Sequence, residues 1–259
     1  MHTVVGTQPG IDLASPEVMR PMHTVSVITS ASADRDARRL VTALSLCGFL
    51  AALLMACMLI SAAYTGASLL SLQSGRSLDV IRRELLASPL AALGVRISIA
   101  LNTAFIVTYV SFFAILAARF RPAIGSWPAG LGLGAFLVLA LFDIAGTQHC
   151  SAMLYAIERQ LPVAVWEPQL ETVMAGMRYH CSYVGVALLG LGYLNEGRLG
   201  RACAVILWLG YIPFGAILAT SPIEGVPTLS FSRFVFFVVA FCVSGILFLR
   251  AREQNANIT

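Results

Sequence analysis

Hydrophobic residues in this 259-residue chain gather into long runs that are separated by short polar segments. Six runs stand out, at about 41–64, 97–118, 130–157, 171–194, 202–220 and 230–250. A helix needs about 20 apolar residues to cross a hydrocarbon core of ~30 Å. Backbone amides in lipid must be bonded within the span, which favours helices. The pattern therefore predicts an all-α, polytopic membrane bundle of six transmembrane helices, a domain that covers residues 41–250.

The residues outside this domain form two polar tails. Residues 1–40 hold several prolines and glycines and show no helical apolar period, so we expect a largely disordered N-terminal tail. Residues 251–259 form a short C-terminal tail. The run at 41–64 starts too late and is too long for the apolar part of a signal peptide, so it is predicted to remain as an anchor.

The segment between the first two runs, at about 77–88, has an amphipathic pattern. Leu78, Ile81 and Leu85 fall on one helical face, and Ser77 is a candidate N-cap. Such a helix is typical of the membrane interface, here the outer one. Two interpretations remain open: a lid over the outer mouth of the bundle, or a connector that rests on lipid headgroups.

Composition supports the membrane class, because 58% of residues are hydrophobic, 12% are charged and the mean hydropathy is +0.81. The net charge of +4 comes from 17 basic residues, all arginine, most of which flank the hydrophobic runs. Ten lie on one side of the expected bundle and five on the other: Arg20, Arg35, Arg38, Arg39, Arg119, Arg121, Arg198, Arg201, Arg250 and Arg252, against Arg76, Arg82, Arg83, Arg159 and Arg233. The positive-inside rule then predicts cytoplasmic N and C termini.

The placement of the arginines also indicates which partners and which location to expect. The arginines are explained by topology, so no nucleic-acid partner is expected. Membrane lipids and other membrane subunits are the expected partners, and the expected location is the plasma membrane, specifically a bacterial inner membrane. The six cysteines all fall within or beside the runs and show no C-x-x-C spacing, so neither a disulfide framework nor a zinc site is predicted.

Several polar residues interrupt the runs, and ionisable residues inside a membrane are functional candidates because they are costly to bury. If the third and fourth helices are antiparallel, residues whose numbers sum to about 329 lie at equal depth, which sets His149 level with His180. Similar reasoning for the second and third helices sets Asn102 level with Gly146. The expected outward-side polar layer contains Arg96, Asn102, His149, Arg178 and His180, with Asp143 some 9 Å deeper.

Helical angles within this layer limit which side chains can meet. Asp143 and His149 are separated by about 120° around their helix and do not share a face. The nearest polar candidate for Asp143 is Asn102 on the second helix, with Tyr109 as a further partner. An ion pair with Arg178 is not predicted, because the assumed register separates the two by about 12 Å in depth.

Four interpretations of the layer remain open. It could be interhelical glue, or a ligand-binding or lipid-binding site that uses Arg96, Asn102, Asp143, His149, Arg178 and His180. It could also bind b-type haem, with His149 and His180 as axial ligands and an arginine at the propionates, or belong to a small-molecule transporter. No catalytic signature is present, so the sequence leaves open whether the protein is an enzyme.

Three stretches of residues 97–194 carry a resemblance: "LNTAFIVTYVSFFAILAARF", "LFDIAGTQHCSAMLY" and "RYHCSYVGVALLGLGYL". They resemble a group of uncharacterised bacterial six-helix integral membrane proteins. In that group the Asp of the third helix is usually followed by Glu-Asn, a position where this chain has Gly146 and Thr147. The resemblance implies the six-helix architecture and no activity.

Overall fold

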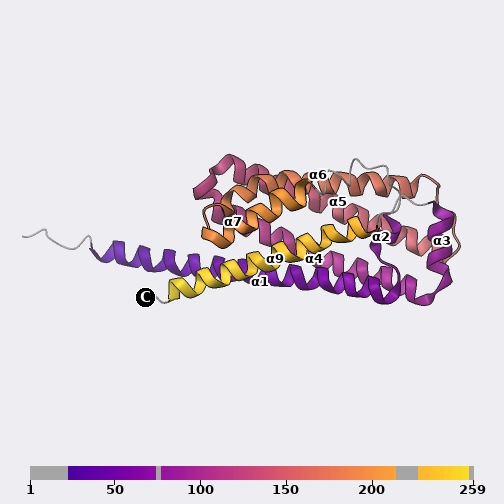
Figure 1. Cartoon of the computed structure of the whole chain (residues 1–259), viewed down its shortest axis with the longest axis horizontal. Helices are drawn as coiled ribbons and strands as arrows, with labels where there is room; N and C mark the ends of the chain where they lie inside the picture. The colour runs from indigo at the N-terminus through magenta and orange to yellow at the C-terminus, as the bar shows by residue number, and fades with distance from the viewer. Residues whose placement is uncertain (1–22, 74–76, 214–226, 257–259) are drawn as a thin grey trace, which may run out of the picture. The chain divides into compact units, whose positions relative to one another are not determined.

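The computed structural model describes residues 23–73, 77–213 and 227–256, and these residues form helices with no strand (Figure 1). The helices are α1 (His23–Thr65), α2 (Leu69–Leu72), α3 (Leu78–Ala87), α4 (Pro89–Ile124), α5 (Ser126–Glu158), α6 (Glu167–Tyr193), α7 (Gly197–Val205), the π-helical segment η1 (Ile206–Tyr211) and α9 (Pro227–Ala256). The chain divides into two compact units, Met1–Ala37 and Arg38–Thr259, and the residues that line the candidate site belong to the second.

Four of the described helical segments are long and apolar enough to cross a membrane: Arg35–Thr65, Pro89–Ile124, Ser126–Glu158 and Val235–Glu253. These segments contain three of the six expected spans and overlap a fourth, 230–250, and they indicate a membrane protein. The fourth expected span, 171–194, falls in α6, which carries two glutamates and an arginine. The fifth, 202–220, begins in α7 and continues through η1, and its residues after 213 lie outside the described part.

The structure extends helices into both predicted tails. α1 begins at His23 and α9 continues to Ala256, so residues 23–40 and 251–256 are helical. Residues 1–22 and 257–259 lie outside the described residues. The predicted amphipathic helix is present as α3, with Ser77 at its N-cap position and with Ile81 and Leu85 buried.

A single glycine joins α4 to α5. Gly125 has a backbone φ of +89°, a value that residues other than glycine rarely adopt. Its N–H donates to the Arg121 carbonyl. Because the connection is one residue long, the two helices fold back on each other and their register is fixed. Asn102 donates from Nδ2 to Thr147 Oγ1 at 2.9 Å, next to Gly146, which confirms the predicted level of Asn102.

Close packing also fixes α6 against α5 (Figure 1). A Cβ added to Gly185 of α6 would lie 2.5 Å from Phe136 Cε2, and one added to Gly132 of α5 would lie 2.9 Å from Leu189 Cγ. Phe136 in turn stacks on Phe113 of α4, with ring centroids 3.4 Å apart. Small residues thus allow the helices to approach, as is common between membrane helices.

Helices α1 and α9, far apart in sequence, also make a close contact. Ser45 Oγ donates to the Gly245 carbonyl at 2.9 Å, and a Cβ on Gly48 would lie 3.1 Å from the Phe241 carbonyl oxygen. Phe241 itself packs edge-on against Phe112 of α4. The last helix is therefore held beside the first and against α4.

The contact at Gly185 predicts the effect of a single methyl group. Gly185→Ala should lower the free energy of unfolding by about 1–3 kcal/mol, because the Phe136 ring has to move. Gly176→Ala, in the same helix, meets nothing within 4 Å and should be neutral or stabilising by about 0.5–1 kcal/mol. Thermal unfolding in detergent checks both, and equal melting temperatures for the two variants would contradict the packing.

Candidate functional site

A buried arginine joins two carboxylates between α5 and α6. Arg178 Nη2 donates to Glu171 Oε1 at 2.7 Å, and Nη1 donates to Asp143 Oδ1 at 3.3 Å. The side chains of Arg178, Glu171 and Asp143 are only 6%, 0% and 17% exposed. Glu171 and Arg178 are seven residues apart, two turns of α6, so both point to the same neighbouring helix.

Gly146 of α5 provides the space for this cluster. A Cβ at that position would lie 2.7 Å from Glu171 Oε1 and 2.9 Å from Arg178 Nη1. The absence of a side chain lets the guanidinium and the carboxylate lie against the α5 backbone. Gly146 therefore allows the charged groups of Glu171 and Arg178 to pack directly against α5.

Two further side chains extend the cluster to α4 and to the segment after α2. Tyr109 OH donates to Asp143 Oδ2 at 2.8 Å, and Gln73 Nε2 donates to Glu171 Oε1 at 3.0 Å. Gln73 is placed by the short α2, whose N-cap Ser68 forms a capping box with Ser71. We use the name polar cluster for Gln73, Tyr109, Asp143, Glu171 and Arg178.

The polar cluster has an electrostatic imbalance. With the acidic groups ionised, one guanidinium faces two carboxylates, which leaves a formal charge of −1. Glu171 Oε2 is buried and has no hydrogen-bond partner. Buried polar atoms without partners are rare in proteins and call for an explanation.

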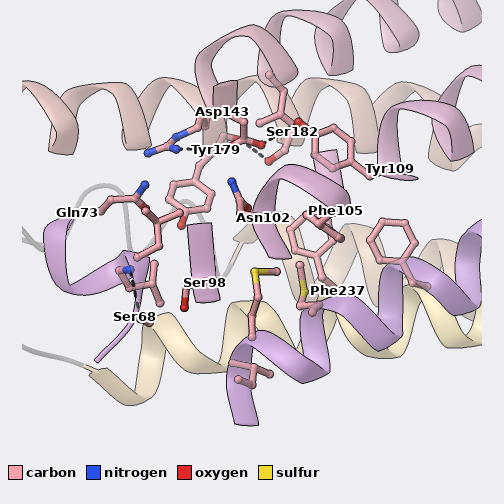
Figure 2. Close-up of a pocket in the computed structure, with 18 of the residues that line it drawn as sticks. Ser68, Gln73, Ser98, Asn102, Phe105, Tyr109, Asp143, Tyr179, Ser182 and Phe237 are labelled. Atoms are coloured by element: carbon pink, nitrogen blue, oxygen red, sulfur yellow. Dashed lines mark hydrogen bonds and ion pairs between the residues drawn. The ribbon is translucent and has the colours of Figure 1, made fainter. Parts of the chain in front are cut away.

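The polar cluster borders a cavity of about 130 Å³. Its other walls come from α1, α2, α4, α5, α6, η1 and α9 and are mainly apolar and aromatic. Figure 2 shows Asp143, Tyr179 and Ser182 along one side of the cavity, with Phe105 and Phe237 on another. A dry cavity of about 150 Å³ can hold benzene, so this space admits a group of about that size.

The π-helical segment η1 contributes Tyr211 to the same cavity. Tyr211 is buried, its hydroxyl lies 2.6 Å from Ser182 Oγ, and its ring centroid lies 4.4 Å from that of Phe237. Ser182 Oγ also donates to the Tyr179 carbonyl at 2.7 Å. Short π-helical segments are frequent at functional sites, and this one turns an aromatic side chain toward the cavity.

The structure separates the residues of the predicted layer. Asn102, Asp143 and Arg178 line the cavity, whereas Arg96, His149 and His180 do not. Arg96 is 62% exposed and pairs with Glu158, with Nη2 and Oε2 2.6 Å apart. Asn102, the expected partner of Asp143, donates to Thr147 instead. The hydrogen bond from α4 to Asp143 comes from Tyr109.

The two histidines do not lie at one level. His149 Nε2 donates to the Glu167 carbonyl at 3.4 Å, at the beginning of α6. His180 is thirteen residues further along α6, about 20 Å of helix. It is exposed on the helix surface, where its Nδ1 donates to the Gly176 carbonyl at 2.8 Å. The expectation of equal depth is therefore wrong, and the pair is not placed to share one haem iron.

The incorrect register expected between α5 and α6 also excluded the Asp143–Arg178 ion pair, which the structure contains. The turn between α5 and α6 lies earlier in the chain than the sum rule of about 329 assumes. In the structure Phe136 meets Gly185 and His149 meets Glu167, so Arg178 comes level with Asp143. The 3.3 Å contact corrects the expectation that the two are about 12 Å apart.

Sequence reasoning also missed Glu171 and Gln73. Glu171 is the first residue of the expected span 171–194, and its spacing of seven from Arg178 is a sequence signal of a shared helical face. Gln73 lies in the polar connection after the first span, and its pairing with Glu171 depends on the tertiary fold.

No group of three or more His, Cys, Asp or Glu that could hold a metal ion occurs among the described residues. All six cysteines are free thiols. Together, the four apolar helices and the buried polar cluster indicate a helical membrane protein with a cavity between its helices. Neither family models, curated proteins nor solved structures match this chain, so the resemblance to bacterial six-helix proteins stays a prediction.

The polar cluster predicts a strong effect from the loss of its cation. Arg178→Met leaves two buried carboxylates without a counter-charge and should lower stability by about 3–5 kcal/mol. Adding Asp143→Asn and Glu171→Gln to that variant removes both charges and should restore most of the loss. Thermal or denaturant unfolding in detergent measures the series.

Arg96→Met is the matched control, because Arg96 also forms an ion pair but is mostly exposed. It should change stability by less than about 1 kcal/mol. A loss for Arg178→Met no larger than for Arg96→Met would contradict the structural role of the cluster.

Proposed function

We propose that this chain is a six-span membrane protein that binds an amphipathic small molecule or a single lipid group in its internal cavity. The observation that carries the proposal is the cavity itself, an apolar and aromatic space of about 130 Å³ that ends in a charged polar cluster. Ligand pockets typically combine apolar walls with a few convergent polar groups. The apolar part of the ligand would lie among Phe105, Phe237 and Phe241, and its polar part at Asp143.

Structural glue alone accounts less well for the same residues. Polar side chains that only join helices are expected to satisfy one another within a closed interface. Here Asp143 and Arg178 border an open space, and the buried Ser98 Oγ, which also borders it, has no hydrogen-bond partner. Haem binding through His149 and His180 has no support in the geometry, and transport would require a second arrangement of the helices.

Six spans, with both termini in the cytoplasm, remain our proposal for topology. α6 is 27 residues long, about 40 Å of helix, which exceeds the ~30 Å hydrocarbon core. Glu196, just after α6, pairs with Arg119 near the end of α4 at 3.1 Å. This contact supports a full crossing by α6, because it brings the end of α6 to the same side as the α4–α5 turn. The proposed location is a bacterial inner membrane.

Reporter fusions test this topology at one informative position. A reporter placed after Glu196 should report the cytoplasm if α6 crosses, and the outside if only the four most apolar segments do. Both arrangements place the C-terminus on the side of the N-terminus, so a C-terminal fusion serves as the control. An external signal after Glu196 would overturn the six-span proposal.

Ligand binding is tested with a small neutral probe and a variant that fills the cavity. 2-Phenylethanol carries one ring of about the expected size, and at 100 times its Kd it should stabilise the purified protein by about 2.7 kcal/mol. Ala62→Phe introduces a ring into the cavity wall and should abolish this shift. Calorimetry and melting temperatures in detergent give the readout.

The control for this experiment is Ala63→Phe, at an exposed neighbouring position that does not line the cavity. It should retain the stabilisation by 2-phenylethanol. The same response in both phenylalanine variants, or no saturable binding to the unmodified chain, would refute a ligand site in the cavity.

A further inference from the structure

The charge of the polar cluster bears on what kind of ligand the cavity accepts. Arg178 is shared between Asp143 and Glu171, so with both carboxylates ionised and histidine neutral the cluster carries a formal −1. His149, the nearest basic side chain on α5, bonds to a backbone carbonyl and does not enter the ion pairs. An unbalanced charge in a low-dielectric interior is costly, and a bound cation would offset it.

Asp143 is the carboxylate that the cavity exposes to a ligand. It lines the cavity, whereas Glu171 lies behind Arg178 and does not. Each oxygen of Asp143 accepts one described hydrogen bond, Oδ2 from Tyr109 and Oδ1 from Arg178. A carboxylate offers about four lone-pair sites, so Asp143 retains capacity to accept from a donor in the cavity.

A second, independent observation comes from Ser98 of α4. Its side chain lines the cavity, is buried, and its Oγ has no hydrogen-bond partner. Buried hydroxyls without partners are costly, so Ser98 marks a second place along the cavity, apart from Asp143, where a polar group of a ligand would be stabilised. Ser98 precedes Asn102 by four residues, so both lie on the face of α4 that looks into the cavity (Figure 2).

The aromatic walls favour the same sign of charge. The cavity is bordered by the rings of Phe105, Tyr109, Tyr179, Tyr211, Phe237 and Phe241. The faces of such rings attract cations within about 6 Å and are unfavourable to anions. The carboxylate of Asp143 and the aromatic rings thus agree in their preference for a positively charged group.

We infer that the ligand of this cavity is a lipophilic amine, with its ammonium group at Asp143 and its apolar part among the aromatic rings. This inference rests on the proposed function and names the ligand class for the same site. The ammonium offsets the formal −1 of the polar cluster and donates to Asp143. The volume of about 130 Å³ limits the enclosed part to about the size of one aromatic ring.

Three probes that share one ring and differ in charge test the inference. 2-Phenylethylammonium, 2-phenylethanol and phenylacetate are titrated by calorimetry into the full-length protein in detergent at pH 7. The cation should bind at least about 10-fold more tightly than the alcohol, a difference of about 1.4 kcal/mol, and the anion more weakly than both. Binding of the alcohol with no preference for the cation would overturn the amine inference and leave the proposed function standing. Failure of all three probes would overturn both.

Two variants test whether the preference for the cation over the alcohol comes from the polar cluster. Asp143→Asn removes the charge that lines the cavity and should bring the affinities for cation and alcohol to within about 2-fold, while the alcohol still binds. Glu171→Gln removes the same charge from behind Arg178 and should also weaken the preference. Glu158→Gln, which alters only the Arg96 ion pair, should leave it unchanged. A preference that survives in both cluster variants would refute the inference.

The source of the amine is separated by reconstitution. The protein is placed in bilayers of phosphatidylglycerol alone, or mixed with phosphatidylethanolamine, and titrated again with 2-phenylethylammonium. Weaker binding in the mixed bilayer assigns the site to the amine of a lipid headgroup, and equal binding assigns it to a free amine. Both results keep the ammonium at Asp143, and loss of probe binding in both bilayers would refute it.

Discussion

The rest of the site depends on the guanidinium of Arg178 and the two carboxylates that share it. An unpaired charge in the interior of a membrane bundle is costly, so Arg178 can occupy its position only if Asp143 and Glu171 lie within reach. This requirement couples α5 to α6, and through Tyr109 and Gln73 it also couples α4 and the segment after α2. A buried ion pair adds little net stability over apolar packing, yet it selects one register among several. The position of the cavity follows from that register.

Glycines make the required approach of the helices possible. Gly146 allows the ion cluster to lie against the α5 backbone, and Gly185 allows α6 to accept the ring of Phe136. These contacts act at different levels of the same helix pair, so they fix both distance and register. Gly125 fixes the neighbouring pair differently, through a one-residue turn at positive φ.

The cavity lies where this regular packing changes. The π-helical segment η1 alters the helical period just where Tyr211 turns toward Ser182, and the short α2 places Ser68 and Gln73 beside the polar cluster. Aromatic residues of α4, η1 and α9 border the space. The apolar walls and the charged side of this space are the basis of the proposed amphipathic ligand.

The sequence by itself determined the class of the fold and the local elements. Long apolar runs force helices in lipid, so four of the six expected spans coincide with helices apolar enough to cross, and the amphipathic 77–88 segment is a helix. It also determined that Asp143 and Arg178 are costly enough to need partners, and the short turn at Gly125 set the level of Asn102. Only the tertiary structure decided which partners meet. Residues 159–166 between α5 and α6 do not fix where the second helix starts beside the first, and an error of a few residues there separates Asp143 from Arg178 and falsely aligns His149 with His180. The spacing of seven puts Glu171 and Arg178 on one face of α6, but which neighbouring helix that face meets depends on packing contacts such as those of Gly146 and Gly185, which no local pattern encodes.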